Sequence, residues 1–300
     1  MGVRLRHVWQ QGPVIAALAR AGMAAIKKPE TSGSLQTPTP EIEQVVPARP
    51  SGLIDDYVRH VGGTPSAYRD IVPAHFYPQW GFPALARTLE GVPYDMRRVL
   101  NGGCRIEIHQ PLPRGEDLIL RACLESIDDN GSRAILKQRL ITGTRSVPDA
   151  LTCYNYAIVP LRKKGEKRSK DKKPPKVVPA DAREVAQWRL TPASGREFAV
   201  LTGDFNPIHW IGPAARAAGF KGCILHGFST LARAIESLNK NVWSGDSRWL
   251  HTVDVQFTRP LVLPAKPRVY LTGNQFAVGE APGAPAYLLG TFESESPNHG

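Results

Sequence analysis

Two stretches of this chain repeat one another in the order and spacing of their residues. Ile106–Leu112 reads IEIHQPL and Val255–Leu261 reads VQFTRPL, and each lies between an apolar helical stretch and a β-rich run. Further upstream of each, Tyr57–Gly63 (YVRHVGG) resembles Phe198–Asp204 (FAVLTGD). Two such copies indicate an internal duplication, which constrains the fold to two related halves. The 300 residues are long enough for two domains of ordinary size, with ample length to bury a core.

The first half, residues 51–161, is expected to be α+β. An aromatic-rich helical stretch precedes four strand candidates, and the Asp-Asp-Asn-Gly turn at 128–131 is typical of a hairpin. A helix followed by an antiparallel meander suits a layered packing in which the helix covers one face of the sheet. The expected helices are 53–61 and 74–89, the latter kinked at Pro78 and Pro83, and the expected strands are 104–109, 117–127, 133–142 and 151–159.

The second half, residues 178–295, shows the same alternation of helix and strand patterns. Thr191 is a candidate N-cap and Pro192 suits the first helical position, which predicts a helix running to about residue 201. Apolar residues at spacings of three and four predict a long amphipathic helix over 226–238. The remaining expected elements are a short helix at 213–218 and strands at 250–258, 268–274 and 286–293.

The net charge of +11 is concentrated in two segments outside the expected halves. Residues 1–28 carry five Lys or Arg and no acid, and residues 162–176 carry nine Lys or Arg against two acids. A nucleic-acid-binding fold gathers its positive charge on a folded face, so this distribution argues against nucleic acid as a partner. We expect residues 1–50 to be a basic helix followed by a Pro-rich linker, and residues 162–177 to be a solvated basic linker.

Each basic segment leaves alternatives open. Residues 1–28 could form a loosely docked terminal helix, an amphipathic helix lying on the domain or in weak contact with a membrane surface, or a signal peptide, although Arg20 interrupts the apolar stretch. The linker at 162–177 could be a plain connector or a dock for an acidic acyl carrier or an anionic membrane. Four cysteines without metal-ligand spacing indicate reduced thiols, and no apolar run reaches the length of a membrane span. A cytoplasmic protein is therefore expected.

The stretch that carries chemistry is 201–209, LTGDFNPIH, at the end of an expected helix. Gly203 suits the left-handed conformation that ends a helix, because it has no Cβ. Pro207 cannot continue a helix and keeps the residue before it extended. Asp204 and His209 should therefore lie on a tight, irregular loop that can turn both side chains into one cleft.

The segment Gly203–His209, with Ala215 and the His226-Gly227 pair downstream, resembles the signature of the MaoC-like, R-specific enoyl hydratase (hydratase 2) family. This resemblance implies a double hot-dog fold, in which two antiparallel sheets, each wrapped around a central helix, join side by side. It also implies a (3R)-hydroxyacyl-thioester dehydratase of fatty-acid metabolism, acting on thioesters of CoA or acyl carrier protein. That carrier is a substrate handle, and neither a metal nor a redox cofactor is implied. The molecule would be a monomeric pseudo-dimer or a homodimer.

The resemblance also suggests a role for each residue of the motif. Asp204 is the candidate base that deprotonates the water, and His209 would position that water and shuttle its proton. His226 and Gly227 begin the long helix, whose N–H groups and positive dipole end suit a thioester oxyanion. The Gly227 N–H is the specific choice, because a residue without a side chain lets the carbonyl approach closely. Asn206 is expected to orient the loop or to form a hydrogen bond near the Asp204 and His209 pair.

Taken singly, these residues have ordinary structural explanations. An Asp after a helix-ending Gly is usually a turn residue, and a lone His is more often structural than catalytic, so the complete pattern carries the prediction. In the repeat, Gly63 stands where Asp204 does, and no Asn-Pro-x-His follows it. The first half is therefore expected to lack catalytic residues and to wall an acyl tunnel. His75 is interpreted as structural, since no acid partner for it is evident.

Two rival functions remain open at this level. A thioesterase on the same fold would use an acid to direct water at the carbonyl carbon. A non-catalytic acyl-thioester-binding scaffold would explain the basic segments without using the Asp and His. Fold alone cannot separate these rivals from a dehydratase, because one fold carries many activities.

Overall fold

A computed structural model describes residues 3, 5–26, 35–161 and 174–295. In these ranges the strands form one antiparallel sheet of ten, in the order β1-β3-β4-β5-β2-β7-β10-β9-β8-β6. They are β1 (Ile42–Val46), β2 (Leu100–Ile108), β3 (Leu118–Asp129), β4 (Arg133–Gly143), β5 (Leu151–Pro160), β6 (Arg183–Gln187), β7 (Leu250–Phe257), β8 (Arg268–Thr272), β9 (Gln275–Gly279) and β10 (Leu288–Ser294). The predicted α+β class is confirmed.

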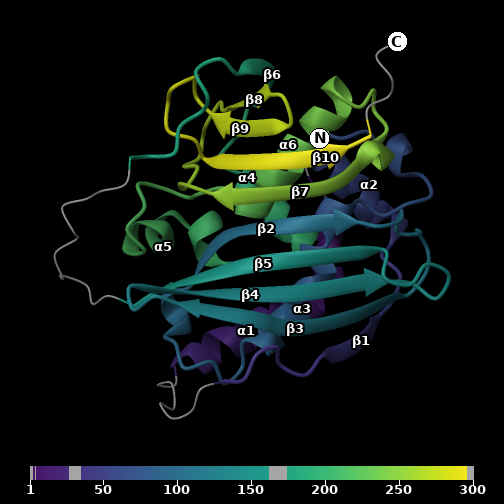
Figure 1. The fold of residues 1–300 in the computed structure, drawn as a ribbon, viewed down its shortest axis with the longest axis vertical. Coiled ribbons are helices and arrows are strands. Elements are labelled where there is room, and N and C mark those ends of the chain that lie inside the picture. Colours follow the sequence, from purple (N-terminus) through teal and green to yellow (C-terminus); the bar gives the residue numbers. More distant parts are fainter. Residues whose placement is uncertain (1–2, 4, 27–34, 162–173, 296–300) are drawn as a thin grey trace.

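The helices form a layer over one face of this sheet, and Figure 1 shows them behind the strands. They are α2 (Ser51–His60), α3 (Pro78–Thr88), α4 (Ser194–Thr202), α5 (Gly212–Ala217) and α6 (Gly227–Asn241), with short 3-10 helices between them. In the first half α3 packs against β3 and β4, where Trp80 Nε1 donates to Thr142 Oγ1 at 3.2 Å. Buried and partly exposed residues alternate along β4, so one face of the strand meets the helical layer.

The two halves meet along β2 and β7 at the centre of the sheet. Arg105 pairs with Asp254, its own counterpart in the repeat. The next residue on each side of Arg105 pairs with the repeat counterpart of the residue on the other side. Such an exchange defines a pseudo-two-fold axis through this pair, as in a dimer with a self-complementary interface. The other repeated segments also meet, since α2 packs on α4 with the rings of Tyr57 and Phe198 6.1 Å apart. One core cluster of buried apolar side chains spans both halves.

The N-terminal segment, η1 (Leu5–Gln11) and α1 (Gly12–Ile26), is part of the helical layer. α1 lies against α3, and η1 lies against α4. Val14 and Ala17 are buried, and the polar His7 and Gln11 are 1% and 0% exposed. Of the alternatives for residues 1–28, the segment therefore lies on the domain. Its docking is not loose, because it buries polar side chains that find partners inside the layer. Among the described residues, no helix has the length and apolar character needed to cross a membrane.

Part of the Pro-rich linker expected within residues 1–50 is a strand. β1 pairs with β3 along its whole length and buries Val46. This five-residue strand was not predicted, because prolines and threonines surround it and its partner strand lies far away in the sequence. β6 and β9 were also missed, because β6 is an edge strand with little burial and β9 follows β8 after a short turn at Gly273.

The start of α4 differs from the prediction. The helix begins at Ser194 and not at Pro192, and Ala193 stands at the N-cap position without a side-chain cap. Ser194 N donates to Thr191 O at 3.1 Å, while Thr191 N donates to Ser194 Oγ at 3.0 Å. Thr191 thus starts a turn that precedes the helix. For the basic linker at 162–177, residues 162–173 lie outside the described residues, so that expectation stays a prediction.

Candidate active site

The loop that carries Asp204 is shaped by the turn residues of the motif. α4 ends at Thr202, and Gly203 follows with φ of +84°, the left-handed conformation predicted for it. η5 (Pro207–His209) begins at the proline and is capped by the side chain of Asn206, which accepts from Ile208 N at 3.4 Å. Asn206 is exposed and acts on the geometry of the loop.

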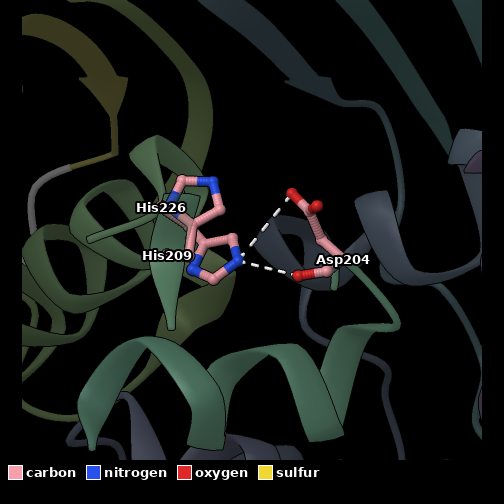
Figure 2. Close-up of side chains that lie close together, drawn as sticks. All are labelled: Asp204, His209 and His226. Carbon is pink, nitrogen blue, oxygen red and sulfur yellow. Dashed lines mark hydrogen bonds and ion pairs between the residues drawn. The ribbon is translucent and has the colours of Figure 1, made fainter. Parts of the chain in front are cut away.

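This loop brings Asp204 and His209 against His226, the residue before α6 (Figure 2). One carboxylate oxygen and one nitrogen from each ring all lie within 4.8 Å of one another. The two imidazole rings stack, with centroids 3.6 Å apart and planes at 24°. His226 and His209 are 2% and 8% exposed, whereas the Asp204 side chain is 19% exposed. A ligand from solvent therefore meets the carboxylate first.

The hydrogen bonds determine the tautomer of each ring. His209 Nδ1 lies 2.8 Å from Ile224 O, and a carbonyl can only accept, so Nδ1 carries the proton and Nε2 keeps a lone pair. His226 Nε2 lies 2.9 Å from Asp204 O, so this ring carries its proton on Nε2. The same Nε2 is 3.9 Å from the Asp204 carboxylate. His226 thus holds the Asp204 backbone, and His209 presents a proton acceptor.

Both imidazoles are held neutral. The pKa of His226 is lowered to about 3, mainly by burial and further by the positive charge that the nearby His209 could carry. Asp204 opposes this shift. Burial also lowers the pKa of His209, against opposing effects of the Asp204 charge and of Ile224 O. At neutral pH both rings are therefore uncharged, which suits proton transfer at His209.

One Asp and two His are also a donor set that zinc or iron uses in proteins. A metal needs lone pairs that converge at about 2.0–2.1 Å. Here the stacked rings hold their lone pairs in nearly parallel planes, and the His226 nitrogen that faces Asp204, Nε2, carries a proton and has no lone pair to offer. This bonding pattern fits proton transfer better than metal ligation.

The first turn of α6 lies directly after the cluster. The first backbone N–H groups of a helix have no intrahelical partner, and they carry the positive end of its dipole. A Cβ on Gly227 would lie 2.9 Å from the ring of Phe257, so the backbone here approaches its neighbours as only glycine allows. Ser229, in the same turn, is fully buried, and its Oγ has no partner among the described residues. No sequence pattern indicates that hydroxyl, because its isolation depends on the packing around it.

A different polar cluster occupies the repeated position in the first half. A Cβ on Gly63 would lie 2.6 Å from the carboxyl group of Glu236, a residue of α6. Glu236 is 1% exposed and accepts from Tyr68 Oη at 2.7 Å and from His75 Nε2 at 3.0 Å. His75 thus has an acid partner, which the sequence analysis missed because it comes from the other half of the chain.

A cavity of about 90 Å³ lies beside this second cluster. Its apolar wall comes from both halves and includes Ile108 of β2, Ile235 of α6 and Val253 of β7. Tyr68 and His75 form part of its surface, but Asp204, His209 and His226 do not.

Comparison with known proteins assigns the second half to a family. A model of the MaoC-like domain matches residues 174–277, which contain the Asp204, His209 and His226 cluster. The peroxisomal enoyl-CoA hydratase 2 of Arabidopsis thaliana is 33% identical over 184 residues, covering 56% of this chain and 58% of that protein. The 3-hydroxyacyl-thioester dehydratase X of Mycobacterium tuberculosis is 34% identical over 109 residues, covering 36% of this chain and 35% of that protein. The chain spans less than two thirds of either relative.

Solved structures share the architecture. HtdX of Mycobacterium tuberculosis matches with a TM-score of 0.67 and 20% identity over 86% of this chain and 100% of that chain. A protein of the same organism described as a double hotdog fold matches with a TM-score of 0.54 and 14% identity over 87% of this chain and 96% of that chain. At these identities the likeness concerns the fold alone, and it confirms the predicted arrangement. The chain is therefore a double hot-dog protein whose residues 174–277 match the MaoC-like domain.

Proposed function

We propose that this protein is a (3R)-hydroxyacyl-thioester dehydratase, which in the reverse direction is an R-specific 2-enoyl-thioester hydratase. The observation that carries the proposal is the pairing of a partly exposed Asp204 carboxylate with a neutral His209 whose Nε2 lone pair is free. Both groups lie beside the first turn of α6. The names of the Arabidopsis and mycobacterial relatives support the same reaction class.

In the hydration direction, a water molecule would donate one hydrogen bond to Asp204 and one to His209 Nε2. The Asp204 carboxylate takes a proton from the water as its oxygen bonds to Cβ of the enoyl group. The C=C electron pair moves to form the enolate, and the proton on Asp204 then passes to Cα. One water is added across the double bond, and the carboxylate is regenerated. Dehydration follows the same steps in reverse.

The enolate oxygen needs stabilisation while it carries negative charge. The Gly227 N–H at the start of α6 would donate to it, and the helix dipole would add to the effect. His226 contributes by holding Asp204 O through Nε2. Its role in the proposal is positional, because its remaining nitrogen is buried without a partner among the described residues.

The apolar cavity between the halves is our candidate for the end of the acyl chain. The branched aliphatic side chains of its wall fit hydrocarbon, and polar side chains such as Arg248 and His251 form the rest of the lining. The substrate class is therefore an acyl thioester of CoA or of an acyl carrier protein. The proposed reaction runs on water and side chains without a metal or redox cofactor, in a monomeric pseudo-dimer or a homodimer.

The test follows the loss of conjugated enoyl-thioester absorbance with short and long 2-enoyl-CoA substrates. Asp204→Asn keeps the size of the side chain and leaves the backbone carbonyl that holds His226. We expect its kcat to fall by roughly a hundredfold or more, as for loss of a general base. Asp70→Asn, an exposed change elsewhere, is the matched control and should retain full activity.

Product analysis separates the rival functions. A (3R)-hydroxyacyl product from the wild type, lost in Asp204→Asn, supports the dehydratase. Release of free CoA would replace it with a thioesterase. Binding of acyl-CoA without turnover at any chain length would replace it with a non-catalytic binding protein.

A further inference from the structure

Gln11 joins the two halves of the molecule near the active-site loop. It is the last residue of η1 and is completely buried. Its Nε2 donates to Leu201 O at 3.0 Å, and its Oε1 accepts from Gln79 Nε2 at 2.9 Å. Leu201 lies in the last turn of α4, where carbonyls lack intrahelical partners, and Gln79 belongs to α3. One glutamine therefore ties the end of α4 to the helix of the other half.

Val14 makes a second contact, directly on the glycine before Asp204. A Cβ added to Gly203 would lie 2.7 Å from the Cβ of Val14 and 3.2 Å from that of Gln11. The N-terminal segment thus packs against the backbone of the loop at its first residue. Val14 is 2% exposed, so this contact excludes water from the place where α4 ends.

The N-terminal segment is itself anchored at other points. His7 Nε2 lies 2.8 Å from Asp56 Oδ2 on α2, and His7 Nδ1 lies 2.9 Å from Gln10 Oε1. α1 also packs along α3. The segment is therefore fixed to α2 and α3 of the first half while it contacts α4 of the second, so it can hold the loop in place.

We propose that the N-terminal segment is a positioning element of the active site, with Gln11 as its main positioning residue. The segment lies outside the MaoC-like domain match at 174–277. Its contacts at Gly203 position the next residue, Asp204, which supplies both the carboxylate and the backbone oxygen that binds His226. A shift of this loop would move the carboxylate and loosen that imidazole together. The catalytic part of this inference rests on the proposed function.

The variant Gln11→Leu removes both hydrogen bonds with little change in volume. We expect kcat for enoyl-thioester hydration to fall about tenfold or more with a smaller change in KM, because misplacing a catalytic group by about 1 Å can cost a hundredfold. Trp9→Ala, on the same 3-10 helix but 90% exposed, is the matched control and should leave kcat unchanged.

A second readout does not depend on the reaction. The ¹⁵N shifts and tautomer of His226, observed in protein with labelled histidine, report its Nε2–H bond to Asp204 O. We expect these signals to move in Gln11→Leu and to stay in place in Trp9→Ala. If the wild type hydrates no enoyl thioester but the His226 signals move, the proposed function fails and the positioning role stands.

The remaining outcomes decide the inference in the same way. Folded Gln11→Leu with unchanged kcat and unchanged His226 signals would overturn it, as would an equal effect of Trp9→Ala. If Gln11→Leu does not fold, Val14→Ala decides, since it removes only the methyl groups against Gly203. Movement of the His226 signals in that variant supports the inference, and unchanged signals overturn it.

Discussion

The two halves share one scaffold, but the acidic residues at the two repeated positions are held in opposite ways, and the acid beside Gly63 comes from α6 of the second half. In the second half, Asp204 lies on a loop with its side chain 19% exposed, beside a histidine that keeps a free lone pair. At the repeated position in the first half, the carboxylate of Glu236 fills the space beside Gly63 and is 1% exposed. It accepts hydrogen bonds from a tyrosine and a histidine.

This difference separates a reactive acid from a structural one. A carboxylate whose lone pairs are used inside the protein has little left for water or substrate, and it binds the two halves together. A carboxylate at the edge of a cleft keeps lone pairs for a reacting water. An Asp or Glu near a His is therefore not enough for catalysis, and exposure to solvent decides which pair can act.

Separate substitutions of His209 and His75 should show the difference between the two sites most clearly. His209→Asn keeps a donor for Ile224 O but loses the Nε2 acceptor, so kcat should fall by about 10²–10⁴ with little change in melting temperature. His75→Asn should show the reverse pattern, with activity per folded molecule within about threefold of wild type and a lower melting temperature. Enoyl-thioester turnover and thermal unfolding measure both. Equal loss of activity in the two variants would contradict the comparison.

Removal of the buried acid tests the structural side. Glu236→Leu leaves the His75 and Tyr68 partners buried and unpaired, which should cost about 3–5 kcal/mol in the free energy of unfolding. Urea denaturation measures this loss, and kcat of the folded fraction should stay near that of wild type. Glu293→Leu, a change on the exposed side of β10, serves as control. A large drop in kcat at unchanged stability would place Glu236 in the catalytic machinery.

Acid should destabilise the fold through His226. Its folded pKa of about 3 lies below the usual 6.5, so the unfolded chain binds a proton below pH 6.5 while the folded chain does not. Stability from this group is present above pH 6.5 and is lost as the pH falls toward 3. Between pH 6.5 and 5 the loss is about 2 kcal/mol. The free energy of unfolding, measured with urea across this range, should fall less steeply with decreasing pH in His226→Gln than in the wild type. Equal pH dependence in the two proteins would refute the assignment.

The sequence predicted the parts of this comparison that depend on local chemistry. Gly203 and Pro207 determined the shape of the loop because their backbone limits hold in any context. The repeat of 106–112 at 255–261 predicted a duplication, and the side-by-side pairing of the halves was implied by the family resemblance. What it missed depends on contacts between distant residues. The strand β1 can be recognised only from its pairing with β3, and the acid partner of His75 is an α6 residue far along the chain. Gln11 was unremarkable in sequence because its role exists only where three helices meet.

The smallest expected effect concerns the acyl chain. The repeat equates Ile108 with Phe257, whose ring packs against Gly227, whereas the smaller Ile108 lines the cavity in the first half. Ile108→Phe should fill that cavity, so kcat/KM for long 2-enoyl thioesters should fall about tenfold while four-carbon substrates are unaffected. Ile108→Leu, which conserves volume, is the control and should match wild type.

The dependence on chain length gives this last variant its meaning. Equal loss for short and long substrates would show that the larger ring disturbs the sheet, which thermal unfolding would register as well. No loss for either would place the acyl chain elsewhere and leave the cavity as a packing defect of the duplication. Loss confined to long substrates would show that the half without the catalytic loop serves the reaction by holding the part of the substrate that does not react.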